Sequence, residues 1–96
     1  MARLRRTSDA RNDLTAIWLY IAQNNLSAAD RLMDEINHTL KLLLRFPLMG
    51  EAVDHLRPGV RRATIDNYQL FYEPTADGIR LLRVYHAARR IEDLFT

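Results

Sequence analysis

The segment Ile79–Tyr85 constrains the fold most, because it has apolar residues at positions that point to both sides of a β-strand. The Ala76-Asp77-Gly78 sequence just before it is typical of a turn. A strand with two apolar faces belongs in the interior of a sheet rather than at its edge. Arg80 and Arg83 interrupt this run, and strand alternation predicts that their side chains point to opposite faces.

The first half of the chain predicts two amphipathic helices. Leu14, Ile17, Trp18 and Ile21 follow the spacing of one helix face, with Ser8 as the expected N-cap and Asn24-Asn25 as the end. Ser27 and Asp30 predict a capping box for the second helix, which Pro47 ends. One broad apolar stripe runs along this second helix and comprises Ala29, Leu32, Met33, Ile36, Leu40, Leu43 and Leu44. Only a short link around Asn24-Asn25 joins the two helices, so we expect them to pair antiparallel.

Three further strands are predicted, at residues 2–6, 60–65 and 68–73, with Asp66-Asn67 as a hairpin turn between the last two. Ile91, Leu94 and Phe95 predict a short helical tail. The predicted fold is α+β with element order β-α-α-β-β-β, in which a helical hairpin packs on one face of a mainly antiparallel sheet. The whole chain, residues 1–96, is predicted to form a single domain.

Composition excludes several classes of protein and site. The chain has no cysteine, so it can form neither disulfides nor thiolate zinc sites. Its three histidines lack metal-binding spacing, its three glycines form no phosphate loop, and both serines serve as predicted helix caps. We therefore predict no metal and no cofactor. No apolar run approaches the length of a membrane span and the N-terminus lacks a signal sequence, which predicts no membrane association and a cytoplasmic protein.

The second half of the chain is rich in arginine, histidine and tyrosine. The residues of interest are Arg57, Arg61, Arg62, Arg80, Arg83, His86, Arg89 and Arg90, together with Tyr68, Tyr72 and Tyr85. Such a set can stabilise phosphorane charge and move protons in RNA cleavage without a metal. It can equally bind phosphates without cutting, or pair with the carboxylates of an acidic partner. The residue types alone leave these three alternatives open.

The apolar stripes of the two helices are wider together than one sheet face requires. We therefore expect an apolar groove to remain for a partner, with Trp18 and Tyr20 as candidate lining residues. A groove of this kind predicts that the free chain is less soluble than its complex.

Six phrases in this order and spacing resemble the ParE/RelE superfamily of bacterial toxins, and its ParE branch in particular. They are Asp13-Leu-Thr-Ala-Ile-Trp-Leu-Tyr-Ile-Ala22, Ala28-Ala-Asp-Arg31, Phe46-Pro-Leu-Met-Gly50, Leu56-Arg-Pro-Gly-Val-Arg61, Tyr68-Gln-Leu-Phe-Tyr72 and Leu82-Arg-Val-Tyr-His-Ala-Ala-Arg89. The likeness covers nearly the whole chain. It implies the toxin of a type II toxin–antitoxin system, which inhibits DNA gyrase and is neutralised by a ParD-like antitoxin. It also implies that specific nucleic-acid binding occurs only through the antitoxin complex.

This resemblance suggests two sets of site residues. We assign antitoxin binding to Trp18, Ile21, Ile36, Leu40, Arg61 and Tyr72, and contact with the target to Arg83, His86, Arg89 and Arg90. The alternative is the RelE branch, which cleaves mRNA on the ribosome and relies on lysines on the middle strands, an arginine after the last strand and a tyrosine about six residues beyond it. Here Arg89 matches the arginine, but the middle strands carry no lysine and Phe95 stands at the tyrosine position. These departures disfavour cleavage, so we assign no catalytic residue. A third alternative is a toxin fold that retains only antitoxin binding.

Overall fold

The computed structural model describes residues 2–87, and these residues form two helices and five strands. In chain order the elements are β1 (Arg3–Arg6), α1 (Ser8–Ala22), α2 (Leu26–Arg45), β2 (Glu51–Ala52), β3 (Arg61–Ile65), β4 (Tyr68–Thr75) and β5 (Gly78–His86). The predicted helical tail at residues 91–95 lies outside the described residues.

The five strands form one sheet in the order β1-β5-β4-β3-β2. β1 runs parallel to β5 and the other neighbours are antiparallel, so the predicted α+β fold with a mainly antiparallel sheet is confirmed. β5 lies between β1 and β4, which confirms its prediction as an interior strand. The sequence did not predict β2. This strand has only two residues, which pair with Arg61 and Arg62, and so short a strand shows no alternating pattern.

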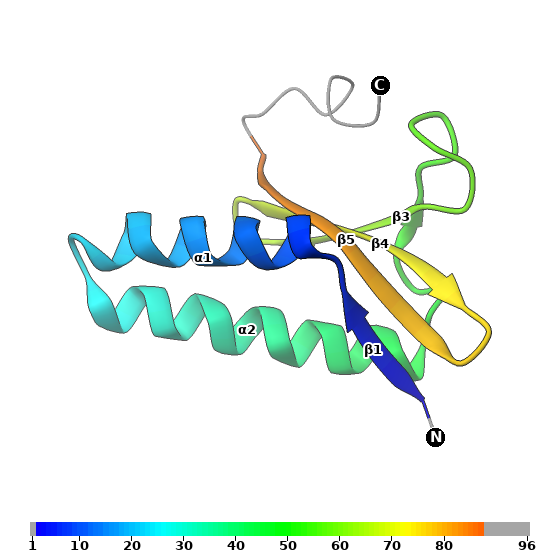
Figure 1. Cartoon of the computed structure of the whole chain (residues 1–96), viewed down its shortest axis with the longest axis horizontal. Helices are drawn as coiled ribbons and strands as arrows, with labels where there is room; N and C mark the ends of the chain where they lie inside the picture. The colour runs from blue at the N-terminus through cyan, green and yellow to red at the C-terminus, as the bar shows by residue number, and fades with distance from the viewer. Residues whose placement is uncertain (1, 88–96) are drawn as a thin grey trace.

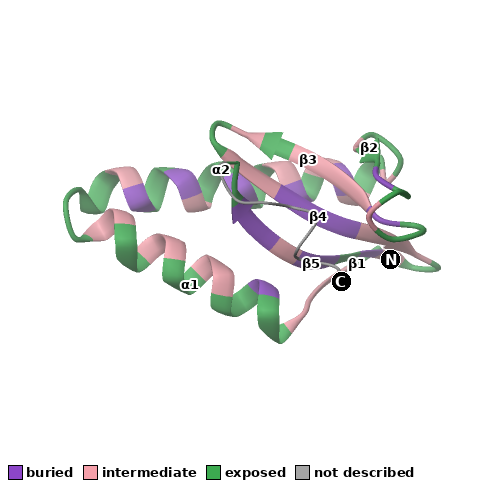
Figure 2. Cartoon of the chain, turned by 90° about the horizontal axis from the view of Figure 1, so that it is seen from above, coloured by how far each residue is buried: buried purple, intermediate pink, exposed green. Residues whose placement is uncertain are grey.

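The helices α1 and α2 lie antiparallel beside each other and cover one face of the sheet (Figure 1). Their apolar stripes pack on alternate residues of β4 and β5 in a core that contains Leu32, Ile36, Leu40, Leu43, Leu70, Tyr72, Ile79, Leu81 and Val84. The turn between the helices lies beyond the end of the sheet (Figures 1 and 2). The inner faces of the helices near this turn therefore have no strand beneath them.

A second apolar cluster lies on the opposite face of the sheet. Val53 and Val60 from the loop between β2 and β3 pack there against Phe71, Leu82 and Tyr85. The loop is closed by its own hydrogen bonds, including one from Gly59 N to Asp54 Oδ1 at 2.9 Å, and Gly59 has the positive φ of 83° that its turn requires. This loop explains why β5 is apolar on both faces.

A β-bulge in β5 overturns the prediction that Arg80 and Arg83 point to opposite faces. The register shifts where Phe71 pairs with Arg83 but Tyr72 pairs with Leu81, so that β5 has one extra residue. Arg80 pairs with Glu73, two residues from Phe71 on β4. Paired residues share a face, so both arginines lie on the same face of the sheet. The extra residue cancels the alternation that a regular strand would have imposed.

The structure also corrects both predicted helix caps. Thr7, not Ser8, caps α1: its Oγ1 accepts a hydrogen bond from Ala10 N at 3.0 Å and donates one to Leu82 O at 2.8 Å. Asn25, not Ser27, caps α2 and accepts a hydrogen bond from Ala28 N at 3.0 Å. α1 ends at Ala22 with Gln23 as its C-cap, directly before the Asn24-Asn25 pair that was predicted to end it.

Candidate partner-binding groove

The overhang of the helices beyond the sheet creates two hollows that share Tyr68. One has a volume of about 480 Å³ and is lined by Ala16, Ile17, Tyr20, Tyr68 and His86. The other has a volume of about 270 Å³ and is lined by Ile21, Ala28, Arg31, Leu32, Glu35, Asp66, Asn67 and Tyr68. We call the two hollows together the Tyr68 groove. The sequence predicted a groove from the width of the two apolar stripes, whereas the hollows follow from the length of the helices, which extend beyond the end of the sheet.

The centre of the groove is the aromatic side chain of Tyr68. Its ring meets the imidazole of His86 edge to face, with centroids 5.3 Å apart. Burial of the phenol, and then its electrostatic interaction with Tyr20, raise the pKa of Tyr68 above its usual value. The phenol is therefore neutral at physiological pH and offers a hydrogen-bond donor on an otherwise apolar surface.

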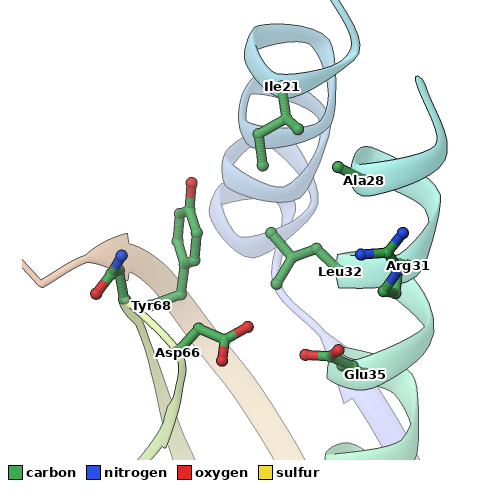
Figure 3. Close-up of a pocket in the computed structure, with 8 residues that line it drawn as sticks. Ile21, Ala28, Arg31, Leu32, Glu35, Asp66 and Tyr68 are labelled. Carbon is green, nitrogen blue, oxygen red and sulfur yellow. The ribbon is translucent and has the colours of Figure 1, made fainter. Parts of the chain in front are cut away.

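Acidic side chains border the second hollow (Figure 3). The carboxylate of Glu35 on α2 faces that of Asp66 in the turn between β3 and β4, with Arg31 at the rim. Among the residues that the structure describes, neither carboxylate has a cation within ion-pair distance. The groove is therefore an apolar surface with a polar rim, the arrangement found in protein–protein interfaces.

The predicted antitoxin-binding residues occupy different places. Ile21 lines the Tyr68 groove, whereas Trp18 lines a separate hollow of about 270 Å³ between α1 and α2 and donates from Nε1 to Asp30 Oδ1 at 2.9 Å. Ile36 and Leu40 are buried in the helix-facing core. The free chain does not present these two core residues to a partner, and their role in antitoxin binding stays a prediction.

Arg61 and Tyr72 meet, but they bind a segment of this chain. Both contact the connection between α2 and β2: Tyr72 Oη donates to Pro47 O at 2.8 Å, and Arg61 Nη1 donates to Gly50 O at 2.7 Å. Tyr72 is fully buried, and this burial raises its pKa. Their assignment to antitoxin binding likewise stays a prediction. Their hydrogen bonds to this loop are observed.

Of the four residues predicted to contact the target, the structure describes Arg83 and His86. Arg83 forms a bidentate ion pair with Asp13 of α1, at 2.8 Å from Nε and 3.1 Å from Nη2, and its guanidinium lies 4.6 Å from the centroid of the Tyr85 ring. Hydrogen bonding to Asp13 raises the pKa of Arg83. His86 lines the Tyr68 groove instead. Arg89 and Arg90 lie outside the described residues.

The ion pair of Asp13 also fixes the position of α1 on the sheet. Asp13 Oδ2 accepts a third hydrogen bond, from Val84 N on the edge of β5 beyond the end of β1, at 3.0 Å. Arg83 pairs with Phe71 and lies over the Tyr85 ring, on the face of the sheet away from the helices, and its guanidinium nevertheless reaches this carboxylate of α1. Asp13 therefore connects the helix that forms one wall of the groove to the strand that forms its floor.

Sequence analysis missed Tyr68 and Asp66 as groove residues and missed the apolar loop after α2. The signal for the loop was present, because Phe46, Leu48 and Met49 are large apolar residues in a predicted turn, where polar residues are usual. No sequence signal placed Tyr68 beside Ile21, since they belong to separate elements.

Residues 2–87 contain neither a candidate metal site nor a candidate membrane-spanning helix. Among residues 2–87 no three His, Cys, Asp or Glu side chains lie close enough together to hold a metal ion. No helix within that range has the length and hydropathy of a membrane span.

Comparisons with known proteins agree on one family. Residues 4–91 match the family described as the ParE toxin of the type II toxin–antitoxin system parDE. The chain is 34% identical over 59 residues to Toxin ParE1 of Mycobacterium tuberculosis, a match that spans 60% of each protein. It is 27% identical to Toxin ParE3 of Caulobacter vibrioides over 88% of this chain and 85% of that toxin.

A solved structure shows the same fold. It is titled a chromosomal ParDE TA system from P. aeruginosa and superposes with a TM-score of 0.75 at 24% sequence identity. The match covers 90% of this chain and 96% of that chain.

Proposed function

We propose that this chain is a toxin silenced by a cognate ParD-like antitoxin, because it belongs to the ParE toxins of type II toxin–antitoxin systems. The observation that carries the proposal is the Tyr68 groove, an apolar surface that the fold of residues 2–87 leaves open to solvent. The related P. aeruginosa structure is titled a ParDE system, which supports a ParD-type partner.

The antitoxin would place an amphipathic segment in this groove. Ile17 and Ile21 of α1 and Ala28 of α2 offer apolar contacts, and Tyr68 offers a hydrogen-bond donor at the centre. Binding to the folded chain alone would raise its apparent stability by mass action, and this increase would grow with the logarithm of the antitoxin concentration.

The test is a calorimetric titration of the purified chain with the antitoxin encoded beside it. Tyr20 lines the groove and is 71% exposed, so Tyr20→Ala removes a contact without opening the core. We expect it to weaken antitoxin binding by about ten-fold or more. Leu19→Ala is the matched control, because Leu19 is 52% exposed and is not among the residues lining either hollow. Equal affinity of the two variants would exclude the groove as the binding site.

The target of the toxin is proposed to be DNA gyrase, by analogy with ParE toxins, and the protein would then act in the cytoplasm, where gyrase works. The residues proposed to contact the target, which we call the target surface, are Arg83, His86, Arg89 and Arg90. Supercoiling by purified gyrase with ATP provides the assay. We expect linear plasmid to accumulate with the chain and to disappear when the antitoxin is added.

A substitution in the same assay separates the target surface from the groove. Arg90→Ala should reduce linear plasmid while leaving antitoxin affinity unchanged. Undisturbed supercoiling at a large molar excess of folded chain would exclude gyrase. A ribosome-bound transcript that the chain cleaves would instead support the RelE-type activity, and unchanged growth on induction would indicate that toxicity is absent.

A further inference from the structure

The loop between α2 and β2 displays three large apolar side chains to solvent. Phe46 is 54% exposed, Leu48 is 68% exposed and Met49 is 56% exposed. The three side chains lie within four consecutive residues, and we refer to them as the apolar patch. Exposed apolar side chains gathered in this way mark interaction sites more often than single ones do.

The backbone that carries this patch is tightly held. The hydroxyl of Tyr72 donates to Pro47 O at 2.8 Å and accepts from Gly50 N at 2.9 Å. Arg61 Nη1 donates to Leu48 O at 3.1 Å and to Gly50 O at 2.7 Å. We call residues 46–50 the clamped loop. A fully buried tyrosine and one arginine therefore hold four backbone groups of a loop whose apolar side chains point outward.

The packing around Gly50 tightens this clamp. A Cβ added at Gly50 would lie 2.5 Å from Tyr72 Oη and 3.0 Å from Arg62 O. The loop consequently approaches the sheet more closely than any residue with a side chain allows. A surface fixed before binding loses little conformational entropy on association, which favours affinity.

The surroundings of the clamped loop are cationic. The guanidinium of Arg45 lies 5.5 Å from the ring centroid of Phe46, and Arg61 lies beneath the loop. Residues 36–50 contain Lys41 and Arg45 and no acidic residue. The nearest acidic residue in the chain, Glu51, is already paired with Arg62 at 2.8 Å. A partner that covers the patch should therefore carry carboxylates beside its apolar residues.

We propose that the clamped loop is a second docking site for the antitoxin and takes an acidic amphipathic segment of it. This inference rests on the proposed function and adds a contact separate from the Tyr68 groove. A second copy of this chain would fit poorly, because a symmetric contact would bring Arg45 and Lys41 of both copies together.

The length of α2 sets how far apart the two sites lie. The groove includes Ala28 near the start of α2, and the clamped loop follows its last residue, Arg45. At the rise of an α-helix this separation is about 25 Å. An extended antitoxin segment needs roughly 8 residues to connect the two sites.

The test compares three variants in calorimetric titrations with the antitoxin. Leu48→Asp places a negative charge in the patch and should weaken binding by about ten-fold or more. Leu48→Lys removes the same apolar contact with the opposite charge and should weaken binding less. Leu19→Asp, on an exposed residue of α1, should have no effect and serves as the control.

A fourth variant examines the clamp. Tyr72→Phe keeps the ring and removes both hydrogen bonds between its hydroxyl and the loop. It leaves the exposed side chain of Leu48 in place, so any loss of antitoxin affinity would come from the loosened loop. Circular dichroism and urea unfolding would first establish that each variant is folded.

The outcomes are distinguishable. Normal binding by Leu48→Asp, with a wild-type chain that binds, would overturn the second site and leave the proposed function intact. No binding by the folded wild-type chain would overturn both. Weakening by Leu48→Lys equal to that by Leu48→Asp would overturn the acidic character of the segment. A wild-type dimer in sedimentation that Leu48→Asp dissociates would assign the patch to self-association.

Discussion

The two ends of α2 both expose apolar surface, but they do so in opposite ways. At the start of the helix the surface is concave, because α1 and α2 extend beyond the sheet and leave the Tyr68 groove between the helices and the ends of β4 and β5. At its end the apolar side chains are exposed on the clamped loop, whose backbone is held by hydrogen bonds from Arg61 and Tyr72. The comparison shows that the groove depends on where the helices are anchored, whereas the loop depends on a few buried hydrogen bonds.

The largest expected effect concerns the anchor of the groove wall. Asp13→Ala removes three hydrogen bonds and leaves a half-buried guanidinium and Val84 N without their partner. We expect the free energy of unfolding to fall by about 3 kcal/mol. Urea unfolding measures this change. Glu51→Gln, which breaks the exposed pair with Arg62, is the control and should cost less than about 1 kcal/mol. Equal losses would show that Asp13 is no special anchor.

The next effect tests the clamp. Tyr72→Phe leaves Pro47 O and Gly50 N without the hydroxyl in a partly buried site, and should lower the free energy of unfolding by about 1 to 2 kcal/mol. Tyr20→Phe removes a hydroxyl at an exposed position of α1 and should change it by less than about 0.5 kcal/mol. A neutral Tyr72→Phe would mean that the loop does not depend on this hydroxyl.

A smaller effect separates the predicted cap of α2 from the observed one. Asn25→Ala removes the side chain that accepts from Ala28 N, and should cost about 1 kcal/mol in thermal or urea unfolding. Ser27→Ala should have little effect, because Ser27 lies inside the helix. The reverse order would restore the capping box predicted from the sequence and would move the start of α2 at the groove end.

The smallest expected effect is a pH dependence of stability that arises at Asp77, in the turn before β5 and away from both ends of α2. Hydrogen bonding to Arg5 lowers the pKa of Asp77 to about 2, from the ordinary value near 4. A carboxyl with a lowered pKa stabilises the fold above its unfolded-state pKa, and this contribution is lost as pH falls towards 2. Melting curves should therefore show a small advantage of the natural chain over Asp77→Asn at pH 5 that disappears near pH 2. A constant difference between the two would contradict this assignment.

The apolar spacing predicted both helices and the three longer strands of the second half, because burial on one side of a helix or on both sides of a strand requires that spacing. Their boundaries were less predictable. Thr7 and Ser8 are both good N-caps, and only the position of Leu82 O, which Thr7 also contacts, distinguishes them. β2 was missed because its partner strand, rather than its own residues, makes it a strand.

The candidate sites were predicted in part. The width of the helical stripes indicated a groove, and Ile21 lies in it. Ile36 and Leu40 follow the same stripe, yet they are buried, because the sheet underlies that part of α2 and not the part near Ala28. Helical periodicity identifies which residues share a face, but not where along the helix the covering sheet ends.

The sequence by itself determined the element order, the interior position of β5 and the likeness to ParE toxins, because each depends on residues near one another in the chain. The tertiary structure alone decided the Tyr68 groove, the register shift between β4 and β5, the ion pair of Arg83 with Asp13 and the clamp that holds residues 46–50. Each of these joins side chains from separate elements, and a pairing across such distances depends on register and packing, which no local pattern records.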